Sequence, residues 1–289
     1  MKRIYLLSLV IFFATTAMKM DKPAYRIFDS KGKPTDYSDV VKSALKADIV
    51  FFGELHNSPI CHWLELELTR DIYSDKTKQV IMGAEMFETD DQLILDEYLA
   101  GKMKEKTFEA EVKLWDNYKT DYKPLVQFAL ENKIPFIATN IPRRYAALVN
   151  KSGFEGLDSL STDAKAFLPP LPVAYDPELP GYKGMIEMMG GAGDHVSPNI
   201  PKAQAIKDAA MAYSILKNYR EGSTFIHYNG TYHSNNYEGI IWYIKQARPD
   251  LKIMTIASVE QDSMDNLAEE NLNLADFIIG IPTSMSKSY

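Results

Sequence analysis

The stretch D-I-V-F-F-G-E-L-H-N, residues 48–57, decides the fold. Its run of β-branched and aromatic residues, Ile49–Phe52, stops at Gly53 and is followed at once by Glu54 and His56. This pattern is typical of a buried parallel strand whose carboxyl end carries polar groups. Taken alone, the two residues are as consistent with structural roles as with a functional site. In the structural roles, Glu54 caps the next helix and His56 is a hydrogen-bonded loop histidine.

The same pattern returns three times downstream, which favours the functional interpretation. The apolar runs and the polar residues after them are Gln79–Ala84 with Glu85, Ile134–Thr139 with Asn140 and Arg143, and Ser223–Ile226 with His227, Asn229 and His233. In an open α/β sheet the carboxyl ends of parallel strands lie along one edge. We therefore expect Glu54, His56, Glu85, Arg143 and His233 to converge in one crevice.

Strands and helices alternate along the whole chain, which predicts a three-layer α/β/α fold with a mostly parallel central sheet and right-handed crossovers. With 289 residues, 46% of them hydrophobic, the chain is long enough for one large domain. Further strands are expected at 24–28, 251–257 and 277–281, and helices at 38–46, 59–74, 90–99, 107–114, 122–132, 144–150, 200–219 and 235–246.

The predicted helix 59–74 follows the first strand directly. Glu54 and His56 therefore lie in the loop at its amino end, where the helix dipole favours anions. Its apolar positions at near-helical spacing are Ile60, Trp63, Leu64, Leu66, Leu68 and Ile72. His62 lies in the first turn, and we expect it at the surface rather than as a ligand.

A flap around residues 161–199 is expected to cover the crevice. Residues 161–184 are rich in proline, contain Tyr175 and Tyr182, and predict a long covering loop. A methionine-rich patch, 183–189, is followed by a glycine cluster and His195. Such methionines are either core filler or a surface that faces a ligand.

The first 17 residues have the pattern of a secretory signal: Lys2 and Arg3, a short apolar run, and a Thr-Thr-Ala exit. Cleavage after Ala17 would remove two positive charges and change the formal charge from −7 to −9. We expect an exported protein, periplasmic or associated with the cell envelope, whose functional domain is 18–289. The single cysteine, Cys61, excludes an intramolecular disulfide and offers no lipid-bearing cysteine at the signal end. No dense basic cluster is present, which argues against nucleic acid as a partner.

Five motifs together resemble the ChaN-like haem-binding uptake proteins of the Tiki/TraB/erythromycin-esterase superfamily. They are Gly53–His56, Gly83–Phe87, Asn140–Arg143, Ala203–Ala212 and Gly230–His233. That superfamily is marked by two Gly-x-x-His motifs with a glutamate and an arginine, here Glu85 and Arg143. Family members are often lipoproteins, and this chain departs from them in lacking the lipid-bearing cysteine.

The resemblance implies a haem-binding protein of haem and iron uptake. It also implies a tyrosine as axial ligand, a haem-linked homodimer and an outer-membrane haem transport system as partner. Tyr175 and Tyr182 are the first candidates for the ligand and His195 is the alternative. The sequence contains no C-x-x-C-H motif, which excludes covalent haem attachment through that motif.

The alternative function is a hydrolase, an esterase or a protease, because the superfamily contains such enzymes. Glu54, His56, Glu85 and His233 form a set suited either to a divalent metal that activates water or to metal-free general-base attack. Arg143 would then hold an anion or an oxyanion. The sequence leaves open whether the protein is an enzyme.

Overall fold

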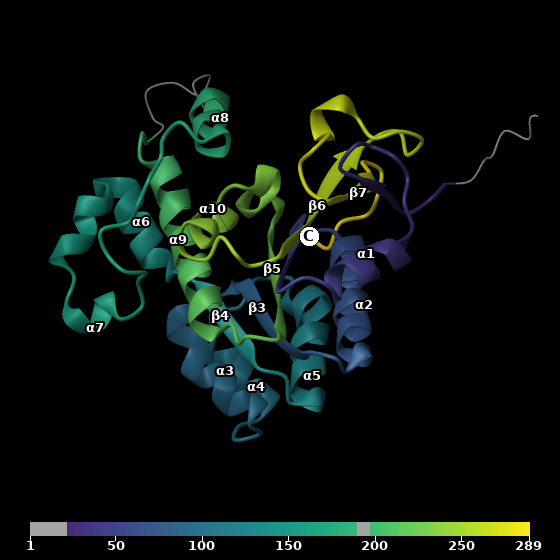
Figure 1. Ribbon diagram of the computed structural model, residues 1–289. Coiled ribbons are helices and arrows are strands. Elements are labelled where there is room, and N and C mark those ends of the chain that lie inside the picture. The colour runs from purple at the N-terminus through teal and green to yellow at the C-terminus, as the bar shows by residue number, and fades with distance from the viewer. Residues whose placement is uncertain (1–21, 190–196) are drawn as a thin grey trace, which may run out of the picture.

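A seven-stranded sheet forms the centre of the computed structural model, which describes residues 22–189 and 197–289 (Figure 1). The strand order is β1-β7-β6-β2-β5-β3-β4, and only β1 runs antiparallel to its neighbour within these residues. The strands are β1 (Arg26–Asp29), β2 (Ile49–Glu54), β3 (Gln79–Glu88), β4 (Phe136–Asn140), β5 (Ser223–Gly230), β6 (Ile253–Gln261) and β7 (Phe277–Pro282). The expected α/β fold with a mostly parallel sheet is confirmed.

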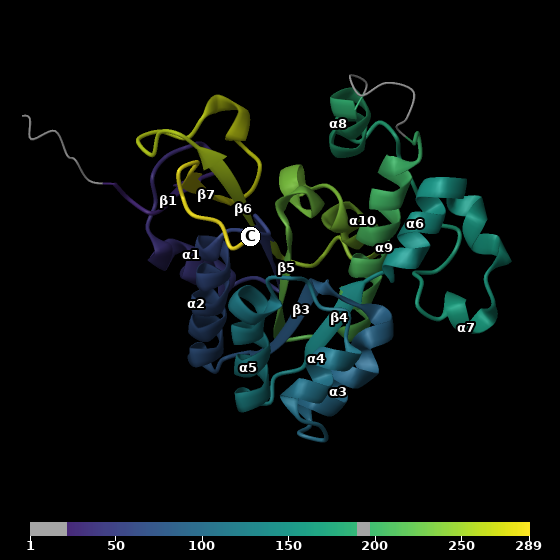
Figure 2. The same cartoon turned by 180° about the vertical axis from the view of Figure 1, so that it is seen from behind.

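Helices cover both faces of the sheet because successive strand residues point to opposite faces. Val50 and Phe52 pack into one core cluster, whereas Ile49 and Phe51 pack into the other. The first face carries α1 (Tyr37–Ala44), α2 (Pro59–Asp75), α3 (Gln92–Leu99), α4 (Glu105–Glu111) and α5 (Lys123–Asn132). The second face carries α9 (Ile200–Asn218) and α10 (Ile240–Ala247), as the two opposite views show (Figures 1 and 2). Both faces of β2 are therefore buried.

The segment that was expected as a covering loop contains two helices, α7 (Thr162–Lys165) and α8 (Pro180–Met189). Pro180 begins α8, which fits the preference of proline for the first helical turn. The methionine-rich patch is therefore helical, and the prediction of a loop through residue 184 was wrong. A further helix, α6 (Arg143–Ser152), packs against α9 through Val149 and Ile206.

The helix expected at 235–246 begins later than predicted. Gly239 adopts a φ of +55°, and a Cβ at that position would lie 2.3 Å from the carbonyl oxygen of His233. Residue 239 therefore has to be glycine, and α10 begins only at Ile240.

Helix α2 is confirmed, and Leu64, Leu68 and Ile72 are buried as expected, but two of its residues were misplaced. Ser58 caps the helix by accepting a hydrogen bond from the Cys61 amide. Trp63 is 49% exposed, although it was placed on the apolar side. His62, which was expected at the surface, is buried with Glu65 and Thr69. The reason is that this side of α2 packs between β2 and a π-helical turn at Tyr118–Tyr122.

No helix among the described residues is both long enough and apolar enough to span a bilayer. The expected secretory signal, 1–17, and His195 lie outside the residues that the structure describes.

Candidate functional site

The carboxyl ends of β2, β5 and β3 lie side by side, and this places the polar residues that follow them at one edge. Gly53 pairs with Asn229 and Glu54 with Gly230 in the register of β2 and β5. From β3, Glu85 Oε2 accepts a hydrogen bond from the Gly230 amide at 2.8 Å. Residues far apart in the sequence therefore meet around Gly230.

At the glycines of the two Gly-x-x-His motifs an added Cβ would make a close contact, with the His56 ring at Gly230 and with backbone at Gly53. A Cβ at Gly230 would lie 2.8 Å from both Cε1 and Nε2 of His56, so the glycine of the second motif makes room for the histidine of the first. A Cβ at Gly53 would lie 2.7 Å from the carbonyl oxygen of Ile256. Backbone at that distance leaves no space for any side chain.

His56 is held by a buried carboxylate. Its Nδ1 lies 2.7 Å from Glu54 Oε1, which also accepts a hydrogen bond from the Tyr122 hydroxyl. Nε2 has no hydrogen-bond partner in the described part of the chain. Burial lowers the pKa of His56, but the bond to Glu54 and the charge of Glu85 outweigh burial and raise it. This arrangement orients an imidazole as a general base or acid.

His233 lies between two carboxylates. Its Nε2 is 3.1 Å from Glu85 Oε1, and its Nδ1 is 2.5 Å from Asp208 Oδ1. Burial lowers the pKa of His233, but the two carboxylates outweigh burial and raise it to about 10. Burial raises the pKa of Glu85, but the charge and the hydrogen bond of His233 outweigh burial and lower that pKa far below its usual range. His233 is thus an imidazolium in a buried ion network.

The structure divides the expected metal set of Glu54, His56, Glu85 and His233 into two pairs. Glu54 contacts His56, and Glu85 contacts His233. Among the described residues, Glu54 forms a compact group of possible ligands with His62 and Glu65.

A pocket of about 400 Å³ opens beside His56. Its walls include Glu85, Trp115, Arg143 and Lys207, and the Trp115 ring meets the His56 ring edge-on at 4.8 Å. Neither Arg143 nor Lys207 forms a salt bridge within residues 22–189 and 197–289. We call this space the crevice pocket; Arg143 and Lys207 bring positive charge to it, and Glu85 and Asp116 bring negative charge.

His227 takes no part in that pocket. It is fully buried, with Nε2 2.8 Å from the Thr139 hydroxyl and Nδ1 2.9 Å from Asn229 Oδ1. Burial lowers its pKa to about 4, so it is neutral. Asn229 therefore positions His227 rather than a histidine of the crevice pocket.

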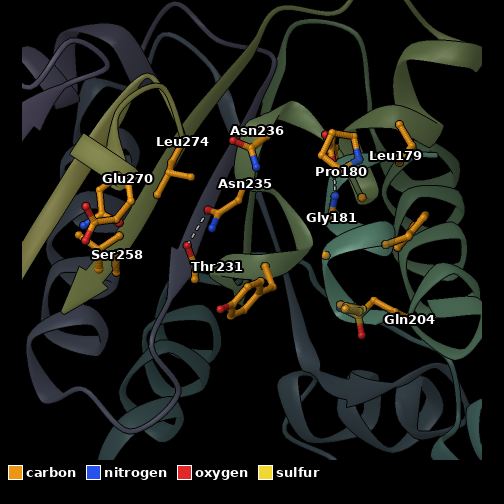
Figure 3. Close-up of a pocket in the computed structure, with 18 of the residues that line it drawn as sticks. Leu179, Pro180, Gly181, Gln204, Thr231, Asn235, Asn236, Ser258, Glu270 and Leu274 are labelled. Atoms are coloured by element: carbon orange, nitrogen blue, oxygen red, sulfur yellow. Dashed lines mark hydrogen bonds between the residues drawn. The ribbon is translucent and has the colours of Figure 1, made fainter. Parts of the chain in front are cut away.

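A second pocket, of about 440 Å³, lies between the ends of β5 and β6 and the start of α8 (Figure 3). One wall carries Ser258 and Leu274, and the opposite wall carries Leu179, Pro180 and Gly181 (Figure 3). Tyr182, Met185 and Tyr232 also line it. We call it the α8 pocket.

The two tyrosines predicted as ligands have different surroundings. Tyr182 lines the α8 pocket but is buried, and its hydroxyl donates to Asp208 Oδ2 at 2.7 Å. Tyr175 lies outside that pocket's lining and packs against Phe154 and Tyr182. Tyr232, which the sequence did not single out, is 67% exposed in the pocket.

Several residues at the site were not predicted from the sequence to belong to it. Gln204, Lys207 and Asp208 share one side of α9 at helical spacing, and this polar stripe in an alanine-rich helix was a readable signal. Tyr122 gave no such signal, because its contact with Glu54 depends on the packing of two distant segments.

Comparisons with known proteins agree with this architecture. The family model described as "Haem-binding uptake, Tiki superfamily, ChaN" matches residues 40–244. A ChaN from Campylobacter jejuni, described with cofacial haem binding, is 17% identical with a TM-score of 0.63, over 88% of this chain and 96% of that one. A Bacillus cereus protein is 11% identical with a TM-score of 0.51, over 89% and 95% of the two chains. Both likenesses concern the fold.

A curated relative matches by sequence. It is the chloroplastic Protein RETICULATA-RELATED 5 of Arabidopsis thaliana, which is 27% identical over 157 residues. The match covers 50% of this chain but only 21% of that protein's length.

Proposed function

Because the chain belongs to the ChaN family of haem-binding uptake proteins in the Tiki superfamily, we propose that it binds haem in the α8 pocket. The observation that carries this proposal is the family match over residues 40–244. This range includes all the pocket-lining residues from Leu55 to Gly239. Haem is held in proteins by apolar contacts and an axial nitrogen, oxygen or sulfur ligand.

The lining of the α8 pocket fits such a ligand. Leu55, Leu179, Met185, Val259 and Leu274 supply apolar contacts, and the methionine thioether adapts readily to a flat aromatic surface. An oxygen donor is available from Tyr232. Bound haem would supply an iron centre whose ligand and redox chemistry depends on that axial residue.

Tyr232 replaces Tyr182 as the proposed axial ligand. Iron would take the oxygen of a phenolate, and burial together with Asp208 raises the pKa of Tyr182 far above its ordinary value. The Tyr182 hydroxyl is also committed to Asp208. The Tyr232 side chain is exposed, so its oxygen would bind iron without first leaving a buried hydrogen bond.

The test is a haem titration of the purified protein followed by absorption. We expect a shifted Soret band that saturates at a fixed molar ratio of haem to protein, because one defined pocket binds a limited amount. A band that grows without saturation, as haem does with unfolded protein, would contradict the proposal. A sample unfolded in denaturant is the control.

We also propose that the protein acts outside the cytoplasm, in haem and iron uptake, as a haem-linked homodimer that works with an outer-membrane haem transport system. The pattern of residues 1–17 and the family description support this proposal. Exported protein is expected to begin near Met18, and amino-terminal sequencing checks this. Exported protein that begins at Met1 would contradict the proposed cleavage.

A hydrolase activity is the second candidate, and the geometry of His56 favours it. Glu54 orients the imidazole, and Arg143 and Lys207 flank the crevice pocket. In such an activity, His56 Nε2 would take a proton from water while the two cations hold an anionic substrate. Haem-free protein incubated with a panel of anionic esters and peptides tests this function.

A further inference from the structure

We infer that Glu54, His62 and Glu65 form a buried three-ligand site for one divalent transition-metal ion, such as Zn²⁺. These three side chains are at most 5% exposed, and one ligand atom from each lies within 4.8 Å of the others. The site is distinct from the α8 pocket proposed for haem and from the network around His233. It joins the end of β2 to α2.

Two buried carboxylates lie together here without a full set of partners. Glu54 Oε2 and Glu65 Oε1 are buried oxygens that accept no hydrogen bond from the described residues. Buried unpaired oxygens are costly, and neighbouring carboxylates also repel each other. A divalent cation between them would remove the repulsion and give Glu54 Oε2 a partner.

The tautomer of His62 points to the same conclusion. Its Nε2 lies 3.0 Å from the His56 carbonyl oxygen, and because a carbonyl only accepts, Nε2 carries the hydrogen. Asn117 Nδ2 donates to the same carbonyl at 2.8 Å and so holds it in place. Histidine ligands of metals commonly donate their second ring nitrogen to a backbone carbonyl in this way.

The remaining nitrogen of His62 faces both carboxylates. Nδ1 is 3.1 Å from Glu65 Oε2 and 3.4 Å from Glu54 Oε2. A lone pair aimed at two carboxylate oxygens is stable only with a proton or a cation between them. Tetrahedral zinc with bonds of about 2.0–2.1 Å separates its ligand atoms by roughly 3.3 Å, which agrees with both distances.

Protons compete with a metal for this site, because ligand side chains must be deprotonated to bind it. One imidazole and two carboxylates form a donor set that zinc accepts.

The experiment compares tag-free parent protein with Glu65→Gln, after both are stripped with EDTA. Zinc is then titrated in competition with a chromophoric chelator. We expect one zinc per parent chain and an affinity about 100-fold lower or worse in the variant, since even supporting residues change metal affinity by about 10–100-fold. Glu67→Gln, on the same helix and paired with Arg70 at the surface, is the matched control and should bind as the parent does.

Thermal melts separate a metal site from a purely protonic cluster. In EDTA, Glu65→Gln should melt at or above the parent, because it removes one of two neighbouring carboxylates. Added zinc should raise the melting temperature of the parent and leave that of the variant unchanged. A parent that binds no stoichiometric zinc, or a variant that binds it as tightly, would overturn the inference. Haem titrations of the same samples keep this result independent of the haem proposal.

Discussion

His233→Ala is expected to lower the free energy of unfolding by about 3–5 kcal/mol, the usual cost of removing one partner from a buried ion pair. The substitution leaves Glu85 and Asp208 buried without their shared cation. For a chain of this size we expect a fall in melting temperature of about 2–4 °C for each kcal/mol. Chemical denaturation of parent and variant measures the difference.

The pH dependence of that difference identifies its electrostatic cause. The folded-state pKa of His233 is raised from 6.5 to about 10, so its stabilisation is fully present below about pH 6.5 and is lost as the pH rises through about 10. The folded-state pKa of Glu85 is lowered, so its contribution is present above about pH 4.5 and is lost on acidification. The loss of stability in His233→Ala should therefore be largest between about pH 4.5 and pH 6.5, where both contributions are fully present.

His227→Ala is the matched control for a lost buried imidazole. His227 is neutral, because burial lowers its pKa to about 4, so its removal should destabilise by an amount that stays constant from pH 7 to pH 10. A His233→Ala deficit below about 1 kcal/mol, or one with the same flat profile as His227→Ala, would show that the network around His233 does not carry this charge.

Tyr232→Phe is expected to weaken haem binding by about 10–100-fold, of the order found when metal coordination is disturbed. It should also move the Soret band, because the axial oxygen is lost while the apolar walls of the α8 pocket remain. Haem titrations by absorption measure both effects. Tyr237→Phe, which removes a hydroxyl bonded to Asp276, is the control and should bind as the parent does.

The crevice variant His56→Gln completes this comparison. It should leave haem affinity within about twofold of the parent, while it lowers any hydrolysis by about 10²–10⁴-fold, the usual contribution of a general base. The opposite result, in which His56→Gln loses haem and Tyr232→Phe keeps it, would show that the two pockets have been given each other's functions. Circular dichroism melts exclude unfolding as the cause.

The sheet and its functional edge were predictable because their signals are local. The apolar runs before Glu54, Glu85, Asn140 and His227 each lie within a few residues of chain, and parallel strands necessarily align their carboxyl ends. The burial of His62 has no comparable local signal. Its polar neighbours Asp121 and Tyr122 come from a π-helical turn that no periodicity announces.

The proposed change of haem ligand from Tyr182 to Tyr232 depends on packing that the sequence does not show. Tyr182 and Tyr232 are both tyrosines near the expected site, and nothing in their neighbouring residues separates them. The packing of α8 on α9 brings Tyr182 to Asp208, whereas the turn after β5 leaves Tyr232 in the open pocket. Only the three-dimensional arrangement separates a tyrosine whose hydroxyl is bonded to Asp208 from one that is exposed in the pocket, and this difference supports the proposal of Tyr232 as the ligand.

The fit of Gly230 against the His56 ring makes the two Gly-x-x-His motifs dependent on each other during evolution. A mutation that adds a side chain at position 230 meets the imidazole of the other motif, so its effect depends on which residue occupies position 56. Neighbouring sites of this kind show non-additive mutational effects. The two motifs therefore form one epistatic unit, and a lineage that loses the histidine of the first releases the constraint on the glycine of the second.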